Sequence, residues 1–189
     1  MRDFPNSAHE VRQLALKLVE FLKKNIENTH PPRSNWSRQN FNLLEMFFGK
    51  GEKGLDLDCL CMTTCSEFLW DFVAYIKERG NLLVAESEWL TDQAELEKDF
   101  EKLLYARSPL KLFMCRIRSE EETEAIRSSL EHIMRSCCIY YSPGEVFIIY
   151  CVWWALQDGI NRDIAYILQL DGEPVYQPIG GEHFEIAAK

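Results

Sequence analysis

The chain has 189 residues and a net charge of −9; hydrophobic residues make up 47% of it and charged residues 27%. This near-average composition excludes a fibrous or disordered chain, and the length suits one domain, which we place at residues 1–189. No apolar run reaches the roughly 18 residues that span a bilayer, and the polar start is unlike a signal peptide. We therefore expect a cytoplasmic protein that binds no membrane.

Residues 8–26 are predicted to form a helix, because apolar side chains recur there at helical spacing and Ser7 precedes them as an N-cap. Pro31 and Pro32 end this pattern, since proline does not continue a helix. Residues 40–48 follow as a shorter predicted helix.

Three apolar, alternating segments come next and predict strands at residues 55–62, 68–76 and 81–89, most simply arranged as a meander. Helical spacing returns over residues 91–106, and residues 110–117 again have the pattern of a strand. The predicted order over this part of the chain is α-β-β-β-α-β.

The remaining sequence predicts one more helix and two more strands. Ser119 opens a capping-box pattern for a helix that ends at about residue 135, and residues 144–155 and 163–170 are strongly apolar. The tail after Tyr176 is expected to be loop.

Three acidic residues are the most informative feature of the predicted hairpin. With Arg79 and Gly80 as the two central turn residues, paired residue numbers sum to 159, so Asp71 lies opposite Glu88. Because strand side chains alternate between faces, Asp71, Glu86 and Glu88 then project from the same side of the sheet.

Opposed like charges destabilise a sheet, and a hard divalent cation such as Mg²⁺ or Mn²⁺ explains three carboxylates at one place. The alternative is a solvated sheet face, where charges discourage aggregation. Apolar residues on the same face, namely Val73, Tyr75 and Val84, favour a partly enclosed acidic cleft.

This order of elements, with an acid on the second strand and E-x-E at the end of the third, resembles the core of the PD-(D/E)XK nuclease superfamily. Restriction endonucleases belong to it. Over roughly residues 40–118 the resemblance implies an α/β, restriction-endonuclease-like core: a central mixed sheet flanked by helices, extended here by the C-terminal helix and strands. The segment VAESEW followed by DFEKLL also looks like a pattern in bacterial proteins of this type.

The resemblance also implies roles for particular residues. Asp71 and Glu86 match the acids that bind the catalytic metal, Mg²⁺ or Mn²⁺. Glu88 stands where a lysine that orients water is usual, although some members have E-x-E; Lys102 on the following helix is the candidate to replace that lysine. Glu45 is the best-placed acid on the preceding helix for a further metal ligand, and an ordinary surface glutamate is its alternative.

Two functions follow from these patterns. The first is a metal-dependent, nuclease-type phosphodiesterase that acts on nucleic acid. The second is a non-catalytic interaction module on a degenerate nuclease scaffold, with a protein partner or a second copy of the chain. Net charge opposes broad nucleic-acid binding, because Lys and Arg make the phosphate contacts. However, residues 1–53 carry nine basic and six acidic residues, or +3, while the rest carries twelve and twenty-four, or −12.

Other groupings point less clearly to chemistry. Seven cysteines, an odd number, are expected to be reduced and metal-free, because the spacing of Cys59, Cys61 and Cys65 differs from a zinc knuckle even with Cys137 and Cys138 added. None of the four histidines lies in a motif that would mark it as a general base or a metal ligand. Trp153 and Trp154 are predicted to lie in the core or at an interface.

Overall fold

The computed structural model describes residues 5, 7–26, 36–49, 54–61, 70–89, 92–117, 119–136, 144–155, 159–171 and 173–179. Its helices are α1 (Ala8–Ile26), α2 (Trp36–Phe48), α3 (Gln93–Leu104) and α4 (Glu120–Ser136). Its strands are β1 (Asp58–Cys61), β2 (Phe72–Ile76), β3 (Gly80–Glu88), β4 (Leu110–Ile117), β5 (Val146–Ala155), β6 (Gly159–Asp171) and β7 (Glu173–Ile179). The expected α/β class is confirmed.

Helix starts follow the predicted caps. The Ser7 Oγ accepts a hydrogen bond from the Glu10 N–H at 3.2 Å, and the Ser119 Oγ accepts one from the Glu122 N–H at 3.3 Å. Each cap satisfies a backbone donor that the helix itself leaves without a partner. Helix α2 begins four residues earlier than predicted, at Trp36. Among the described helices, none combines the length and apolarity needed to cross a bilayer.

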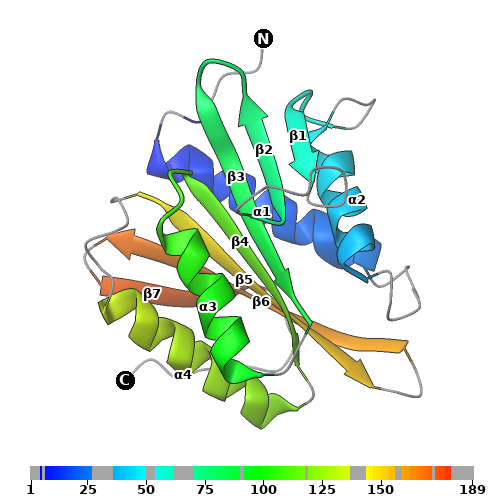
Figure 1. The fold of residues 1–189 in the computed structure, drawn as a ribbon, viewed down its shortest axis with the longest axis vertical. Helices are drawn as coiled ribbons and strands as arrows, with labels where there is room; N and C mark the ends of the chain where they lie inside the picture. Colours follow the sequence, from blue (N-terminus) through cyan, green and yellow to red (C-terminus); the bar gives the residue numbers. More distant parts are fainter. Residues whose placement is uncertain are drawn as a thin grey trace.

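The seven strands lie in sequence order in one mixed sheet (Figure 1). Strands β1, β2 and β3 form the expected antiparallel meander, whereas β4 runs parallel to β3 and β5 runs parallel to β4. Parallel neighbours need a long crossover, and α3 and α4 supply the two crossovers. Strands β6 and β7 continue the sheet as an antiparallel extension.

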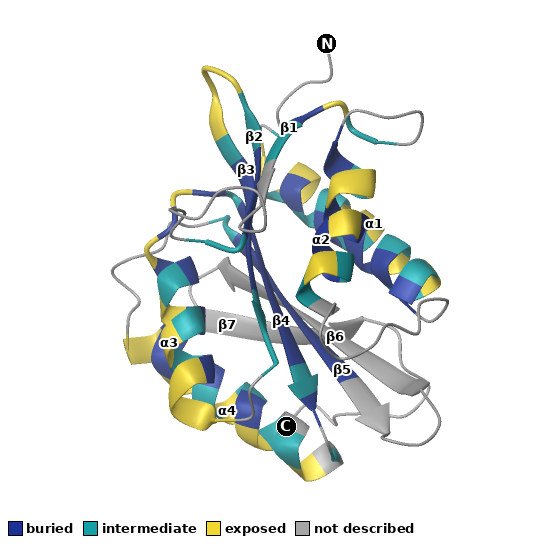
Figure 2. Cartoon of the chain, turned by 45° about the vertical axis from the view of Figure 1, so that its right-hand side comes forward, coloured by how far each residue is buried: buried dark blue, intermediate teal, exposed yellow. Residues whose placement is uncertain are grey.

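Helices cover both faces of the sheet, and Figure 2 shows α1 and α2 on one side with α3 and α4 on the other. Alternate residues of β4 enter the two cores: Leu112 and Met114 pack with α1 and α2, while Phe113 and Cys115 pack with α3 and α4. All four side chains are fully buried. A strand covered on both faces is expected to be a nearly continuous apolar run, as the sequence of β4 is.

The expectation of a loop after Tyr176 is wrong, because β7 extends to Ile179 and pairs with β6. Pro174 and Pro178 interrupt the sequence pattern of a strand, and proline cannot donate to a sheet ladder. Strand β7 tolerates both prolines because it pairs only with β6 in the described sheet.

Lys111 is a charged residue inside the core that α3 and α4 cover. Its side chain is fully buried on β4, its Nζ donates to the Glu145 Oε2 at 2.7 Å, and it lies 4.6 Å from the ring centroid of Phe147. Burial lowers the pKa of Lys111, and the hydrogen bond to Glu145 opposes that shift. The ion pair offsets the cost of burying the ammonium.

Replacing Lys111 with methionine should lower the free energy of unfolding by about 3 kcal/mol, because Glu145 loses its buried partner. The double variant Lys111→Met, Glu145→Leu removes both charges and should recover most of this loss. Urea unfolding of the three proteins measures both effects. A single variant that is no less stable than the double variant would contradict the ion pair's structural role.

Candidate carboxylate site

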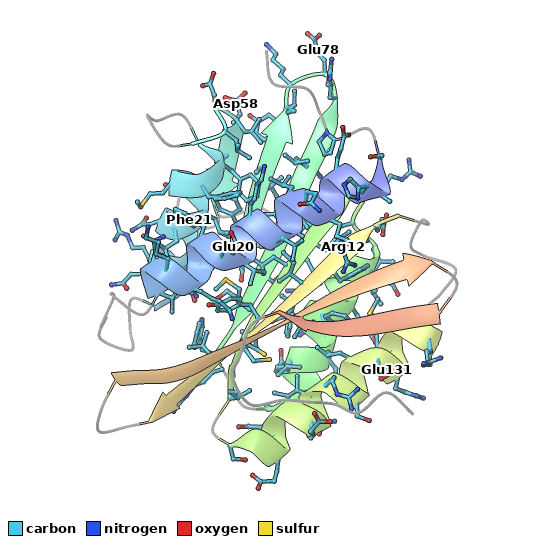
Figure 3. All side chains as sticks on the ribbon, turned by 180° about the vertical axis from the view of Figure 1, so that it is seen from behind. Arg12, Glu20, Phe21, Asp58, Glu78 and Glu131 are labelled. Carbon is cyan, nitrogen blue, oxygen red and sulfur yellow. The ribbon has the colours of Figure 1, made fainter. Side chains whose placement is uncertain are left out.

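The turn of the β2–β3 hairpin differs from the predicted two-residue turn. Ile76 pairs with Gly80, and the Arg79 N–H donates to the Ile76 carbonyl at 2.9 Å. Glu78 lies at the tip of the hairpin (Figure 3). Its φ is 71° and that of Gly80 is 98°, so two residues adopt left-handed backbone where one was expected. The pairs beside the turn therefore sum to 156 rather than 159.

A β-bulge then adds one residue on β3. Tyr75 pairs with Asn81, whereas Ala74 pairs with Leu83, so Leu82 has no partner on β2. Beyond the bulge, paired residue numbers sum to 157. The predicted register is therefore wrong by two residues. An even shift leaves Asp71, Glu86 and Glu88 on their predicted face, whereas Leu82 at the bulge packs on the other face, with α1 and α2.

Continuing this register by one residue places Asp71 opposite Glu86 rather than Glu88. The Asp71 Oδ2 accepts a hydrogen bond from the Ser87 N–H at 2.9 Å, which ties Asp71 to β3. Burial raises the pKa of the Asp71 carboxyl, although the Ser87 hydrogen bond acts in the opposite direction. Asp71 is thus held against the strand that carries the two glutamates.

Glu86 is the most strongly perturbed acid of the site. Its side chain is only 2% exposed, and its Oε1 accepts no hydrogen bond from the described part of the chain. Burial, followed by the charge of Asp71, raises the pKa of Glu86 from 4.5 to about 8. A buried acid with a raised pKa and an unpartnered oxygen is typical of functional sites.

Lys102 brings a positive charge to the two acids from α3. Its Nζ lies 3.8 Å from the Glu86 Oε2 and 2.5 Å from the Asp99 Oδ1. Burial alone would lower the pKa of Lys102, but the hydrogen bond to Asp99 and the charge of Glu86 raise it overall. The Trp70 Nε1 donates to the Lys102 carbonyl at 3.3 Å, which joins the start of the hairpin to the end of α3.

Glu88 and Glu45 lie differently from these residues. Glu88 is half-buried at the end of β3, on the same face as Glu86 and paired with Cys115 of β4. Glu45 is exposed on α2, which packs on the opposite face of the sheet, so the structure does not bring it to the other acids. Within the described ranges, no three His, Cys, Asp or Glu side chains are grouped to hold a metal ion.

Two contributors to the site were not predicted from the sequence. Asp99 precedes Lys102 by three residues, and this spacing on a helix was a usable signal for an ion pair. Trp70 gave no comparable signal, because its contact with the Lys102 carbonyl depends on how α3 packs against the hairpin.

The cysteines whose side chains the structure describes are free thiols: Cys59, Cys115 and Cys151. Cys115 and Cys151 are buried on neighbouring strands with their Sγ atoms 3.5 Å apart. Cys65, Cys137 and Cys138 lie outside the described residues, as do the side chains of Cys61, Trp153 and Trp154. The zinc and tryptophan predictions therefore stay predictions.

Comparison with known proteins adds little to this geometry. No protein-family model and no curated protein matches the chain. One solved structure that matches is the central domain of yeast acetyl-CoA carboxylase, at 12% identity and a TM-score of 0.33. The match covers 66% of this chain and 24% of that one. A likeness this weak carries no argument about fold or function.

The pKa of Glu86 predicts how stability depends on pH. Between its ordinary value of 4.5 and about 8, the folded state binds more protons than the unfolded state. The contribution of Glu86 to stability is therefore greatest below pH 4.5 and is lost as the pH rises through 8. Glu86→Gln should flatten the decline in unfolding free energy over this range.

Urea unfolding at a series of pH values measures this decline. Glu101→Gln, an exposed change on α3, is the matched control and should keep the wild-type profile. Equal profiles for wild type and Glu86→Gln would show that Glu86 is not buried with a raised pKa.

Proposed function

We propose that the chain is a metal-dependent, nuclease-type phosphodiesterase that acts on nucleic acid through Asp71, Glu86 and Glu88, with Lys102 in place of the usual lysine. The proposal includes the restriction-endonuclease-like core that the sequence resembles. Its main support is Glu86, a buried carboxylate with an unpartnered oxygen opposite a second carboxylate. Such an arrangement is costly for stability alone and suits a cation ligand.

The residues present fit Mg²⁺ or Mn²⁺ as a two-carboxylate site. Mg²⁺ usually takes one or two protein carboxylates and completes its coordination with water and substrate phosphate. Asp71 and Glu86 would hold it, with Glu88 next to them on the same face of β3. When bound, the ion would supply positive charge for a phosphate oxygen and for an attacking water.

The chain's own residues have separate tasks in this proposal. Glu86, protonated for the most part at neutral pH, would release its proton when it becomes a ligand. Asp71 stays oriented by the Ser87 N–H. Lys102, held by Asp99 close to Glu86, would stabilise negative charge that develops on a bound phosphate.

Cleavage of single- and double-stranded DNA and RNA with Mn²⁺ or Mg²⁺ tests the activity. Asp71→Asn and Glu86→Gln should each lower the cleavage rate by at least about 100-fold, because each removes electrostatic stabilisation of the transition state. Lys102→Met should lower it by about 10-fold or more. Glu101→Gln, next to Lys102 but exposed, should retain full activity. Cleavage that persists in an Asp71→Asn, Glu86→Gln double variant would rule out this site.

A second candidate function is a non-catalytic interaction module on the same scaffold. Lys102 already lies beside Glu86, and the described residues contain no three-ligand metal group, which favours this alternative. Here the ammonium of Lys102 would take the place of a metal ion permanently, and the acids would be part of a structural cluster.

Metal-dependent melting separates the two functions. In the catalytic proposal, Mn²⁺ at about 100 times its dissociation constant stabilises the folded chain by roughly 2.7 kcal/mol and raises the Tm by about 5 °C or more. The double variant Asp71→Asn, Glu86→Gln should lose this shift. An unchanged Tm in the wild-type chain would support the non-catalytic function.

A further inference from the structure

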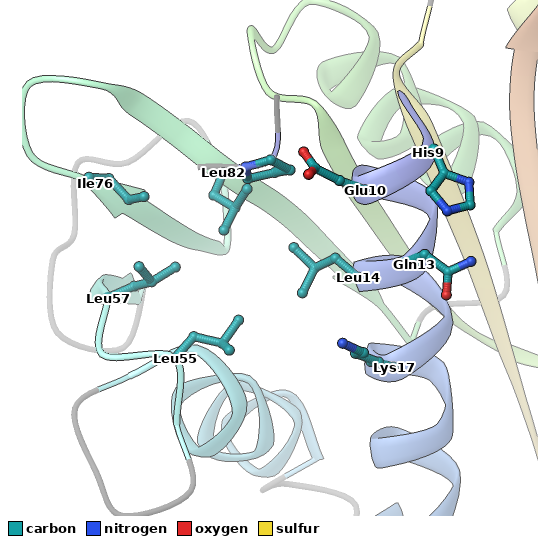
Figure 4. Close-up of a pocket in the computed structure, with 10 residues that line it drawn as sticks. His9, Glu10, Gln13, Leu14, Lys17, Leu55, Leu57, Ile76 and Leu82 are labelled. Atoms are coloured by element: carbon teal, nitrogen blue, oxygen red, sulfur yellow. The ribbon is translucent and has the colours of Figure 1, made fainter. Parts of the chain in front are cut away.

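A cavity of about 450 Å³ lies on the α1 and α2 face of the sheet, away from the carboxylates. Figure 4 shows it between the first turns of α1 on one side and Leu55, Leu57, Ile76 and Leu82 on the other. Its apolar wall consists of Leu14, Leu55, Leu57, Ile76 and Leu82. This volume lies within the range of roughly 300–1,000 Å³ that is usual for small-molecule sites.

Two local features fix the apolar wall. The bulge on β3 gives Leu82 no partner on β2, and both Leu82 and Leu83 pack on the α1 side as a result. The segment before β1 is tied to the end of α2, because the Leu55 N–H donates to the Phe47 carbonyl at 3.0 Å and the Leu57 N–H donates to the Phe48 carbonyl at 2.8 Å. Because these residues are already held in place, little conformational entropy is lost when a ligand binds to them.

The helix wall carries the charge. Glu10, Leu14 and Lys17 point toward the leucines in Figure 4. Glu10 has another interaction partner in the chain, whereas Lys17 makes no ion pair with any residue that the structure describes. The charge available to a ligand is therefore the ammonium of Lys17, at one end of an apolar cavity.

We infer that this cavity binds a small hydrophobic monocarboxylic acid, of which a medium-chain fatty acid is the simplest example. The hydrocarbon part buries the leucines, and this burial supplies most of the affinity. The carboxylate lies at Lys17, where an ion pair near the surface adds a smaller, directional contribution.

Isothermal titration of the full chain with decanoate, below its micelle concentration, tests the inference. We expect one decanoate to bind per chain, about 3-fold more tightly than decanol, given the usual strength of an exposed ion pair. Lys17→Gln should abolish the preference for the acid over the alcohol. Lys24→Gln, an exposed lysine on the same helix outside the cavity, should keep it.

A second variant tests the place of binding. Leu14→Trp fills the cavity from α1, so it should remove decanoate binding while the chain keeps its circular dichroism spectrum and a cooperative unfolding transition. Decanoate binding that survives Leu14→Trp, or no binding by the wild-type chain, would overturn the inference. A dimer in sedimentation that Leu14→Trp disrupts would instead assign this face to a second copy of the chain, and would overturn it too.

Discussion

Strand β3 is covered by helices on both faces, and the alternation of its side chains decides which core each residue enters. Val84 and Glu86 lie toward α3 and α4, whereas Leu83 and Ala85 lie toward α1 and α2. A slip of one residue would exchange the two sets and bury Glu86 beneath α2. The three-residue turn alone would impose such a slip, and the bulge at Leu82 compensates for it. The bulge therefore determines the position of two features on different faces of the sheet. The carboxylates lie on the face of α3 and α4, and the cavity wall lies on the face of α1 and α2.

Two buried ionisable residues in the α3 and α4 core, Lys111 and Glu86, have very different surroundings. Lys111 has a partner oxygen at 2.7 Å and the face of an aromatic ring, so its charge is well compensated. Glu86 has its nearest cation at 3.8 Å and one oxygen without a donor. The first arrangement is what stability requires. The second leaves the carboxyl group of Glu86 without full compensation for its burial. This contrast within a single core is the reason to propose a function for Glu86 rather than for Lys111.

The sequence predicted most of the elements because their signals are local. Helix α1 has an N-cap residue and apolar side chains at helical spacing, and β4 has an apolar run that only Lys111 and Arg116 interrupt. The face of Asp71 and Glu86 was also predictable, since alternation fixes it. Their partners were not: the shift from Glu88 to Glu86 depends on the left-handed backbone of Glu78 and on the bulge, neither of which has a sequence signature here. Glu45 was placed by order along the chain, which does not specify the face that a helix covers.

Strand β7 has a consequence for how the molecule meets its neighbours. Pro174 and Pro178 are four residues apart, so their backbone nitrogens point to the same side. Proline cannot donate to a ladder, so the arrangement that costs no bond with β6 is the one in which that side is the outer edge of the described sheet. In that arrangement two outward donors are missing from a seven-residue edge, and an incoming strand would find only an interrupted row of partners. Prolines placed in this way discourage the edge-to-edge growth that leads to aggregation.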